Sequence, residues 1–234
     1  MRLLWIRHGQ MDFDGFDLSD FATLTRLFNQ QEQASLSDRG RAQAEALALH
    51  WAAANERVDA IYSSTMLRAK ETAEASARVL DLPVSALEEI VEVRAGRATS
   101  RSASARVFSL TSRLPVAQNT RRKIASAALI PLYFKSWYFA ETEGGESRAE
   151  LEVRLRATLR RLRVEQHPDA TVALFAHGYL IFYLSAFLCR SPSRRAAWRF
   201  PYVENCSITE MALDAQGPPR LISFARPHGY SGSS

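Results

Sequence analysis

Leu3-Leu4-Trp5-Ile6-Arg7-His8-Gly9 is the stretch that decides the fold. Its first four residues form a continuous apolar run, typical of a strand that is buried on both faces. A second such run, Thr171–Ala176, is followed directly by His177 and Gly178. In α/β proteins, ligands bind at the carboxyl ends of the parallel strands. The two His-Gly pairs are therefore expected to meet at one edge of a sheet.

Helical and strand-like segments alternate along the rest of the chain. This alternation predicts an α/β fold with three layers, α/β/α, in which helices flank both faces of a mainly parallel sheet. Ser147 and Glu150 form a capping box before the clearest helical pattern. The expected helices cover residues 37–54, 65–80, 144–165 and 179–188, and the further strands residues 60–62, part of 84–93, 207–213 and 221–224.

Composition favours one domain over residues 1–234, since 47% of the residues are hydrophobic. No apolar run approaches the length of a membrane span, and the N-terminal run is too short for the core of a signal peptide. The two cysteines, Cys189 and Cys206, are too few for a disulfide framework. We therefore expect a cytoplasmic protein without membrane contact.

The net charge is +5, and most of the 30 basic residues are arginine. Arginine suits phosphate and carboxylate ligands, although codon bias explains the excess equally well. No nucleic-acid motif is present, so we expect no nucleic-acid partner.

Arg7-His8-Gly9 alone is a weak motif, and its alternative interpretation is a surface turn. A strand–turn–helix pattern over residues 62–73 places Arg68 near a helix N-terminus, where backbone N–H groups favour anions. Alone, Arg68 would be an ordinary surface arginine. The paired His-Gly arrangement is the stronger signal.

Taken in order, six elements resemble the motifs of the histidine phosphatase superfamily, which includes phosphoglycerate mutases. They are Arg7-His8-Gly9, residues 36–44 (Leu-Ser-Asp-Arg-Gly-Arg-Ala-Gln-Ala), residues 63–73 (Ser-Ser-Thr-Met-Leu-Arg-Ala-Lys-Glu-Thr-Ala), residues 90–96 (Ile-Val-Glu-Val-Arg-Ala-Gly), Gly145-Glu146-Ser147 and His177-Gly178. The resemblance spans most of the chain.

The resemblance implies a phosphohistidine mechanism in which a neutral His8 is the nucleophile and no metal or other cofactor is needed. Glu92 would be the general acid and base, with Glu88 and Glu89 as close alternatives in sequence. His177 would be catalytic as a hydrogen-bond donor to the phosphoryl group. The expected phosphate-binding residues are Arg7, Gly9, Arg68, His177 and Gly178.

Two features depart from this pattern or extend it. Asp14 occupies a position where the family often has an asparagine that donates to phosphate; Asn205 and Ser207 are further candidates near the site. Residues 97–142 form a basic insertion that we expect to be helical and to cap the site, and neutralising Arg121 and Arg122 should raise KM if they contact substrate. An ordinary exposed basic helical pair explains the insertion equally well.

The favoured function is a phosphatase acting on a small phosphorylated metabolite. A phosphoglycerate-type mutase and a non-catalytic module that binds phosphorylated ligands are the alternatives. An aromatic cluster in the insertion, which the sequence suggests is exposed, would suit a homodimer interface. The cluster comprises Tyr133, Phe134, Trp137, Tyr138 and Phe139.

Overall fold

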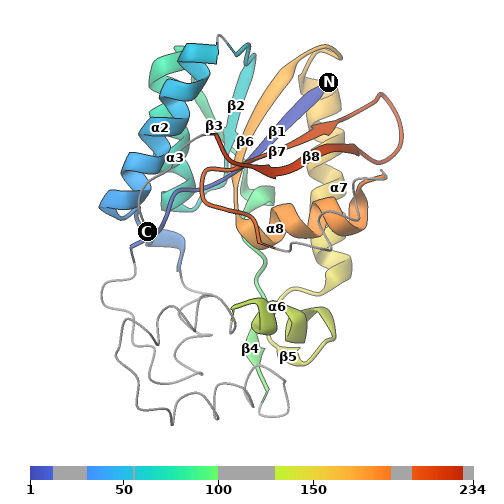
Figure 1. Cartoon of the computed structure of the whole chain (residues 1–234). Coiled ribbons are helices and arrows are strands. Elements are labelled where there is room, and N and C mark those ends of the chain that lie inside the picture. Colours follow the sequence, from blue (N-terminus) through green and yellow to red (C-terminus); the bar gives the residue numbers. More distant parts are fainter. Residues whose placement is uncertain (13–30, 55, 100–129, 191–201, 229–234) are drawn as a thin grey trace. The chain divides into compact units, whose positions relative to one another are not determined.

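The computed structural model describes residues 1–12, 31–54, 56–99, 130–190 and 202–228 (Figure 1). The chain divides into two compact units. The first comprises Met1–Asp12, Gln33–Glu92 and Glu152–Ser234, and the second Phe13–Glu32 and Val93–Leu151.

The first unit contains a six-stranded sheet with the order β3-β2-β6-β1-β7-β8. The first four strands in this order run parallel, and β7 and β8 extend the sheet by antiparallel pairing. Its strands are β1 (Arg2–Arg7), β2 (Ala60–Ser63), β3 (Val84–Ala86), β6 (Thr171–Ala176), β7 (Ile208–Ala212) and β8 (Arg220–Arg226). The predicted mainly parallel sheet is confirmed.

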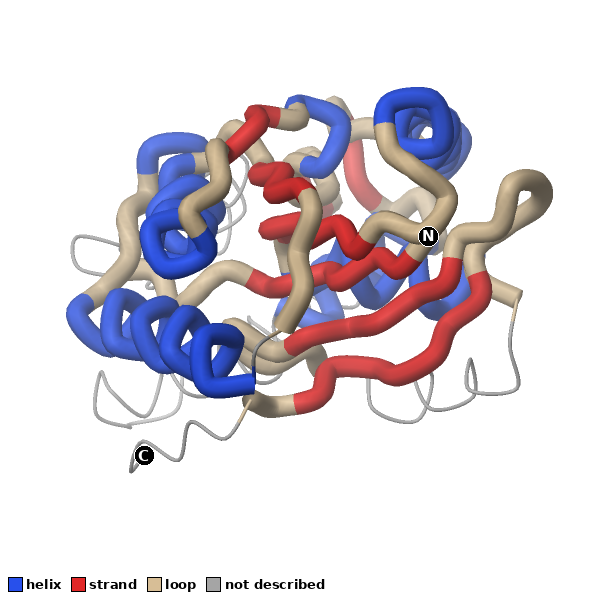
Figure 2. Tube along the Cα trace, turned by 90° about the horizontal axis from the view of Figure 1, so that it is seen from above, coloured by secondary structure: helices blue, strands red, loops and turns tan. Residues whose placement is uncertain are grey.

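Helices cover both faces of this sheet, as Figures 1 and 2 show. On one face, Leu4 and Ile6 of β1 pack in a cluster with Leu47 and Trp51 of α2 (Asp38–Ala54) and with residues of α3 (Leu67–Leu80). The opposite face lies beneath α7 (Arg148–Glu165) and α8 (Gly178–Tyr183). Burial on both faces explains why the strand run at residues 3–6 is apolar throughout.

Several predicted boundaries shift by a few residues. α3 begins at Leu67 rather than at residue 65. α7 begins at Arg148 rather than at residue 144, directly after Ser147, the first residue of its capping box. In that box Ser147 and Glu150 each accept a hydrogen bond from the other's backbone N–H, at 3.2 and 2.7 Å. The helix expected to end at 188 becomes a π-helical turn over Leu184–Leu188. Of the region 84–93, only β3 is a strand, and a 3-10 turn (Glu88–Ile90) follows it.

The described part of the second unit contains a short antiparallel pair, β4 (Arg97–Ala98) with β5 (Thr142–Glu143), and the helix α6 (Ile130–Tyr138). Three aromatic side chains of the expected surface cluster, Tyr133, Phe134 and Trp137, are at least 96% buried. The prediction that this cluster is exposed is therefore wrong for these three, because they pack as core, whereas Phe139 is 62% exposed.

Both cysteines are buried, and neither forms a disulfide with another described residue. Within the ranges given above, no helix combines the length and apolar character of a membrane span.

Candidate active site

The two histidines follow neighbouring parallel strands at the same edge of the sheet. Arg7 and Ala176 are register partners in the β1–β6 pair, so His8 and His177 come next on each strand. The His8 N–H donates to the Ala176 carbonyl at 3.0 Å, and the two imidazole centroids are 5.1 Å apart. The predicted meeting of the two His-Gly pairs is confirmed.

The ring of His8 is oriented through both of its nitrogens. Nδ1 lies 2.6 Å from the carbonyl oxygen of Gly9, and Nε2 lies 3.1 Å from Nε of Arg68. Because an arginine only donates, Nε2 is the acceptor and Nδ1 carries the proton. Burial, reinforced by the charges of Arg68 and Arg7, lowers the pKa of His8 well below its usual value. The ring is therefore neutral, with a lone pair on Nε2.

The loop that carries His8 rests on the start of α2. A Cβ on Gly9 would lie 2.5 Å from the carbonyl oxygen of Gly40, and a Cβ on Gly40 would lie 2.0 Å from that of Gln10. Glycine at both positions is what lets the two backbones approach so closely. The Ser37 hydroxyl caps α2 by accepting from the Gly40 N–H at 3.1 Å and donates to the Gln10 carbonyl. The motif at residues 36–44 therefore supports the loop that carries His8.

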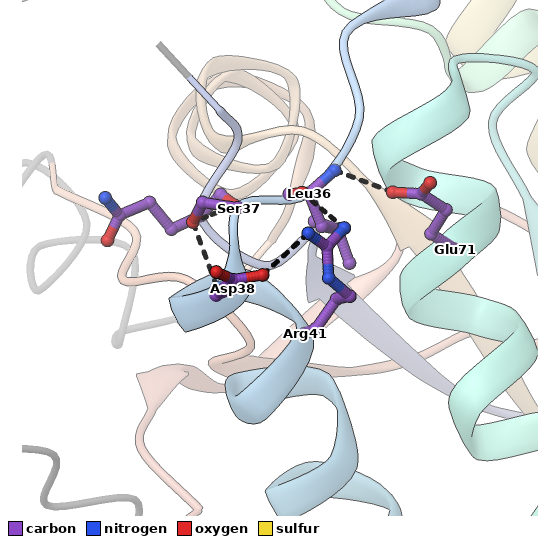
Figure 3. A network of polar contacts seen from close by, with 7 residues as sticks. Leu36, Ser37, Asp38, Arg41 and Glu71 are labelled. Carbon is purple, nitrogen blue, oxygen red and sulfur yellow. Dashed lines mark hydrogen bonds and ion pairs between the residues drawn. The ribbon is translucent and has the colours of Figure 1, made fainter. Parts of the chain in front are cut away.

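Figure 3 shows how the segment before α2 is fixed. The Leu36 N–H donates to Glu71 of α3 at 2.6 Å, and Arg41 donates both to the Leu36 carbonyl and to Asp38. The bond to Glu71 joins the starts of two helices that the sequence separates by about thirty residues, while the two bonds from Arg41 brace the start of α2 itself. They stabilise the support of the His8 loop.

Arg68 lies in the first turn of α3 and is 97% buried. Its Nη2 lies 3.3 Å from Nδ1 of His177, while its Nε donates to His8. Burial lowers the pKa of Arg68 to about 10; Glu92 opposes this shift and Arg7 adds to it. Arg68 still carries its charge at pH 7 and contacts both histidines.

Arg7 is held at the end of β1 by a hydrogen bond from Nη1 to the Val203 carbonyl, and its guanidinium lies 5.4 Å from the ring centroid of Tyr202. Its Nε is buried and has no hydrogen-bond partner among the described residues. A Cβ on Gly178 would lie 3.2 Å from this Nε, so Gly178 provides the space that Arg7 occupies. Gly9 and Gly178 thus act through close packing.

Glu92, the residue predicted to be the acid and base, contacts the backbone that follows His177. Its Oε1 and Oε2 accept from the backbone N–H groups of Leu180 and Tyr179, at 3.0 and 3.2 Å, in the first turn of α8. The carboxylate is close enough to Arg68 to act on its charge. Glu92 is thereby fixed beside the segment that begins at His177.

Some important side chains were missed by sequence reasoning. Arg154 of α7 donates from Nη1 to the carbonyls of Glu89 and Val91, at 2.7 and 3.1 Å, and so holds the backbone just before Glu92. Its position beside the buried leucines of α7 was the available signal, because an arginine there faces inward. Thr72 was missed as well; its hydroxyl accepts from the Gly9 N–H at 3.0 Å.

Asn205 and Ser207 have backbone partners. The Asn205 amide donates to the His8 carbonyl at 2.8 Å, and the Ser207 hydroxyl to the Glu204 carbonyl at 2.7 Å. Asp14, Arg121 and Arg122 lie outside the described residues. Over the described ranges, no group of three or more His, Cys, Asp or Glu side chains is placed to hold a metal ion.

Comparisons with known proteins agree with this geometry. The sequence pattern of the histidine phosphatase superfamily (branch 1) matches residues 3–224. A search of curated protein sequences finds no match.

Similar solved structures include a mycobacterial glucosyl-3-phosphoglycerate phosphatase, with 25% identity over 96% of this chain and 98% of that one and a TM-score of 0.64. A putative alpha-ribazole-5'-P phosphatase from Escherichia coli shares 21% identity over 97% of each chain, with a TM-score of 0.62. A phosphoglycerate mutase from Bacillus anthracis shares 16% identity over 97% of this chain and 93% of that one, with a TM-score of 0.63. The structures from Escherichia coli and Bacillus anthracis share the fold of this chain. Because the family pattern covers nearly the whole chain, the chain belongs to branch 1 of the histidine phosphatase superfamily.

Proposed function

We propose that this chain is a phosphatase that hydrolyses an ester of a small phosphorylated metabolite through a phosphohistidine on His8. The observation that carries the proposal is the state of the His8 ring. A neutral imidazole with Nδ1–H held by a carbonyl and a lone pair on Nε2 is what an in-line attack on phosphorus requires.

In the first step, the hydrogen bond from Arg68 Nε to His8 Nε2 breaks, and the freed Nε2 lone pair forms a bond to phosphorus while the bond from phosphorus to the ester oxygen breaks. Arg7 and Arg68 stabilise the charge on the phosphoryl oxygens. The buried Nε of Arg7, which has no hydrogen-bond partner within the described part of the chain, supports this role. Glu92 donates a proton to the leaving oxygen.

In the second step, water attacks the phosphohistidine. Glu92, now a carboxylate, takes a proton from this water, and the N–P bond breaks to release phosphate and restore a neutral His8. The anchoring of both Glu92 oxygens supports one residue acting in both steps, since it fixes the carboxyl group at the first turn of α8, the helix that follows His177.

Two alternatives are less well supported. A mutase must exclude water from the phosphohistidine and return the phosphoryl group to its product, and the mutase neighbour shares only 16% identity, against 25% for the mycobacterial phosphatase. A non-catalytic binding module has no use for a fixed acid such as Glu92.

The substrate class follows from chemistry and from the relatives. The basic residues of the insertion would suit a substrate that carries a second anionic group besides its phosphate. Glucosyl-3-phosphoglycerate, named for one relative, has such a group in its carboxylate. We therefore propose a phosphorylated small acid or sugar acid as the first class to test.

The test is phosphate release by the purified chain, in buffer with a chelator, from glucosyl-3-phosphoglycerate, alpha-ribazole phosphate, phosphoglycerate, sugar phosphates and nucleotides. His8→Ala should abolish turnover. His167→Ala is the matched control, because that imidazole is 77% exposed, and it should retain full activity. Turnover that survives in His8→Ala would refute the nucleophile.

A second measurement separates hydrolysis from transfer. Incubation with a bisphosphate donor and phosphoglycerate should give free phosphate without exchange of the phosphoryl group between positions. Efficient exchange with little hydrolysis would favour the mutase, and tight binding without either reaction would favour the binding module.

A further inference from the structure

The hydroxyl of Ser64 contacts the second histidine of the site. Ser64 follows β2 and, like His177, is fully buried. Its Oγ lies 2.8 Å from Nε2 of His177 and accepts from the Met66 N–H at 3.3 Å, and its own N–H donates to the Phe175 carbonyl. A hydroxyl has one proton and two lone pairs. The bond from Met66 uses one lone pair, which leaves the proton and the other lone pair for His177.

A neutral His177 carries a single ring proton, and the hydrogen-bond partners of Nδ1 and Nε2 determine which of the two nitrogens holds it. Burial, and then the charge of Arg68, lower the pKa of this imidazole well below its usual value, so the ring is neutral. Nδ1 lies 3.3 Å from Nη2 of Arg68, which can only donate. With the side chains as they stand, Nδ1 accepts from Arg68, and Nε2–H donates to Ser64.

That tautomer does not suit a bound phosphoryl group. The Nδ1 lone pair would face phosphoryl oxygens, whereas Nδ1–H beside Arg68 would give two neighbouring donors for the same anion. In the second tautomer Nε2 needs a donor, and the Ser64 hydroxyl provides one by rotating about its Cβ–Oγ bond.

We propose that Ser64 is a positioning residue that stabilises the Nδ1–H tautomer of His177 by donating its hydroxyl proton to Nε2, so that Nδ1–H can donate to the phosphoryl group when it binds. Nε2 loses one proton and Nδ1 gains one, so the proton count of the ring does not change; because the ring is fully buried, this exchange with water requires a transient opening of the site. The inference rests on the proposed function, since it requires a phosphoryl group at His8 and Arg68.

The neighbouring residue offers a matched control. Ser63 is also fully buried, but its hydroxyl donates to the Ser64 carbonyl at 2.9 Å, with no ring as partner. Ser63→Ala and Ser64→Ala each remove one buried hydroxyl, so a purely structural role predicts similar effects. Ser64→Thr keeps the hydroxyl and tests for rescue.

The decisive measurement is the tautomeric state of His177, read from ring nitrogen shifts in protein labelled with ¹⁵N-histidine, with and without saturating inorganic phosphate. In the unsubstituted protein and in Ser63→Ala, the proton should move from Nε2 to Nδ1 when phosphate binds. In Ser64→Ala this move should be lost, and phosphate affinity and kcat/KM should each fall about tenfold.

The outcomes separate the inference about Ser64 from the proposed function. The inference is overturned if phosphate perturbs the His8 ring while His177 keeps its tautomer, or if Ser64→Ala behaves as Ser63→Ala does in both tautomer and kinetics. If phosphate perturbs neither ring of the unsubstituted protein, the proposed function fails as well. If Ser64→Thr is too bulky to fold, the comparison of the two alanine variants still decides.

Discussion

Thr72→Val tests whether the loop that carries His8 is held by α3. The Thr72 hydroxyl is fully buried, donates to the Arg68 carbonyl at 2.7 Å and accepts from the Gly9 N–H at 3.0 Å. Valine has nearly the same shape but leaves this buried N–H without its partner. An unsatisfied buried donor costs about 1–3 kcal/mol of the free energy of unfolding.

Thr158→Val is the matched control. Thr158 is 99% buried, and its hydroxyl donates to the Arg154 carbonyl at 3.0 Å, the same bond to the preceding helical turn that Thr72 makes. Both variants lose that bond, so the difference between them isolates the contact with Gly9. We expect Thr72→Val to be less stable than Thr158→Val by about 1–3 kcal/mol.

The assay is urea unfolding of both variants, followed by steady-state kinetics on the best substrate. Because Gly9 adjoins His8, the proposed nucleophile, kcat/KM should fall about tenfold in Thr72→Val and stay unchanged in Thr158→Val. Thr72→Ser, which keeps the hydroxyl, should recover most of both losses. Equal stabilities and equal kinetics for the two valine variants would refute the reasoning.

Three further predictions concern the same edge of the sheet. Gly178→Ala should lower kcat/KM about tenfold, because its Cβ displaces Arg7 by a few tenths of an ångström; an unchanged rate would mean that this arginine need not hold its position. The lowered pKa values of His8 and His177 mean that the unfolded chain binds more protons below about pH 6.5, so the free energy of unfolding should fall as pH drops through that value. Asparagine at either position should flatten this dependence in urea titrations at several pH values, and an identical slope would contradict the assignment. Arg154→Ala should lower kcat more than it raises KM, because it releases the backbone turn before Glu92, the proposed acid. Arg154→Lys should restore part of the loss. If a variant of an exposed arginine on α7 lost as much kcat, the loss would reflect a general effect on the helix rather than the contact with this turn.

The parts of the site that follow strands could be predicted from sequence. His8 and His177 each end an apolar run, and the rule that parallel strands share a carboxyl edge was enough to bring them together. Arg68 was recognisable through the family motif at residues 63–73, because its position after a strand and a short turn would by itself indicate an ordinary surface arginine. For the two histidines, local pattern and topology point to the same place.

The partners of these residues could not be predicted in the same way. Thr72, Arg154 and Ser64 act through contacts with distant segments, and nothing in their local sequence identifies those segments. Asn205 lies near the site, as expected, but its bond from the side-chain amide to the His8 carbonyl could not be predicted, because it depends on the pairing of β7 with β1. The burial of Tyr133, Phe134 and Trp137 was not predicted, because the sequence of an apolar cluster does not show whether the cluster lies in a core or on the surface.

The contact between Gly9 and Gly40 has a consequence for how the protein folds. The loop that carries His8 takes its final form only against the first turn of α2. Even when β1 is paired with β6, His8 therefore lacks the backbone contact of Gly9 with Gly40 until α2 is in place. The chain must first close the connection between residue 12 and residue 35. During refolding, the activity of the site should therefore return only once α2 has docked, so the recovery of turnover would report on that docking step.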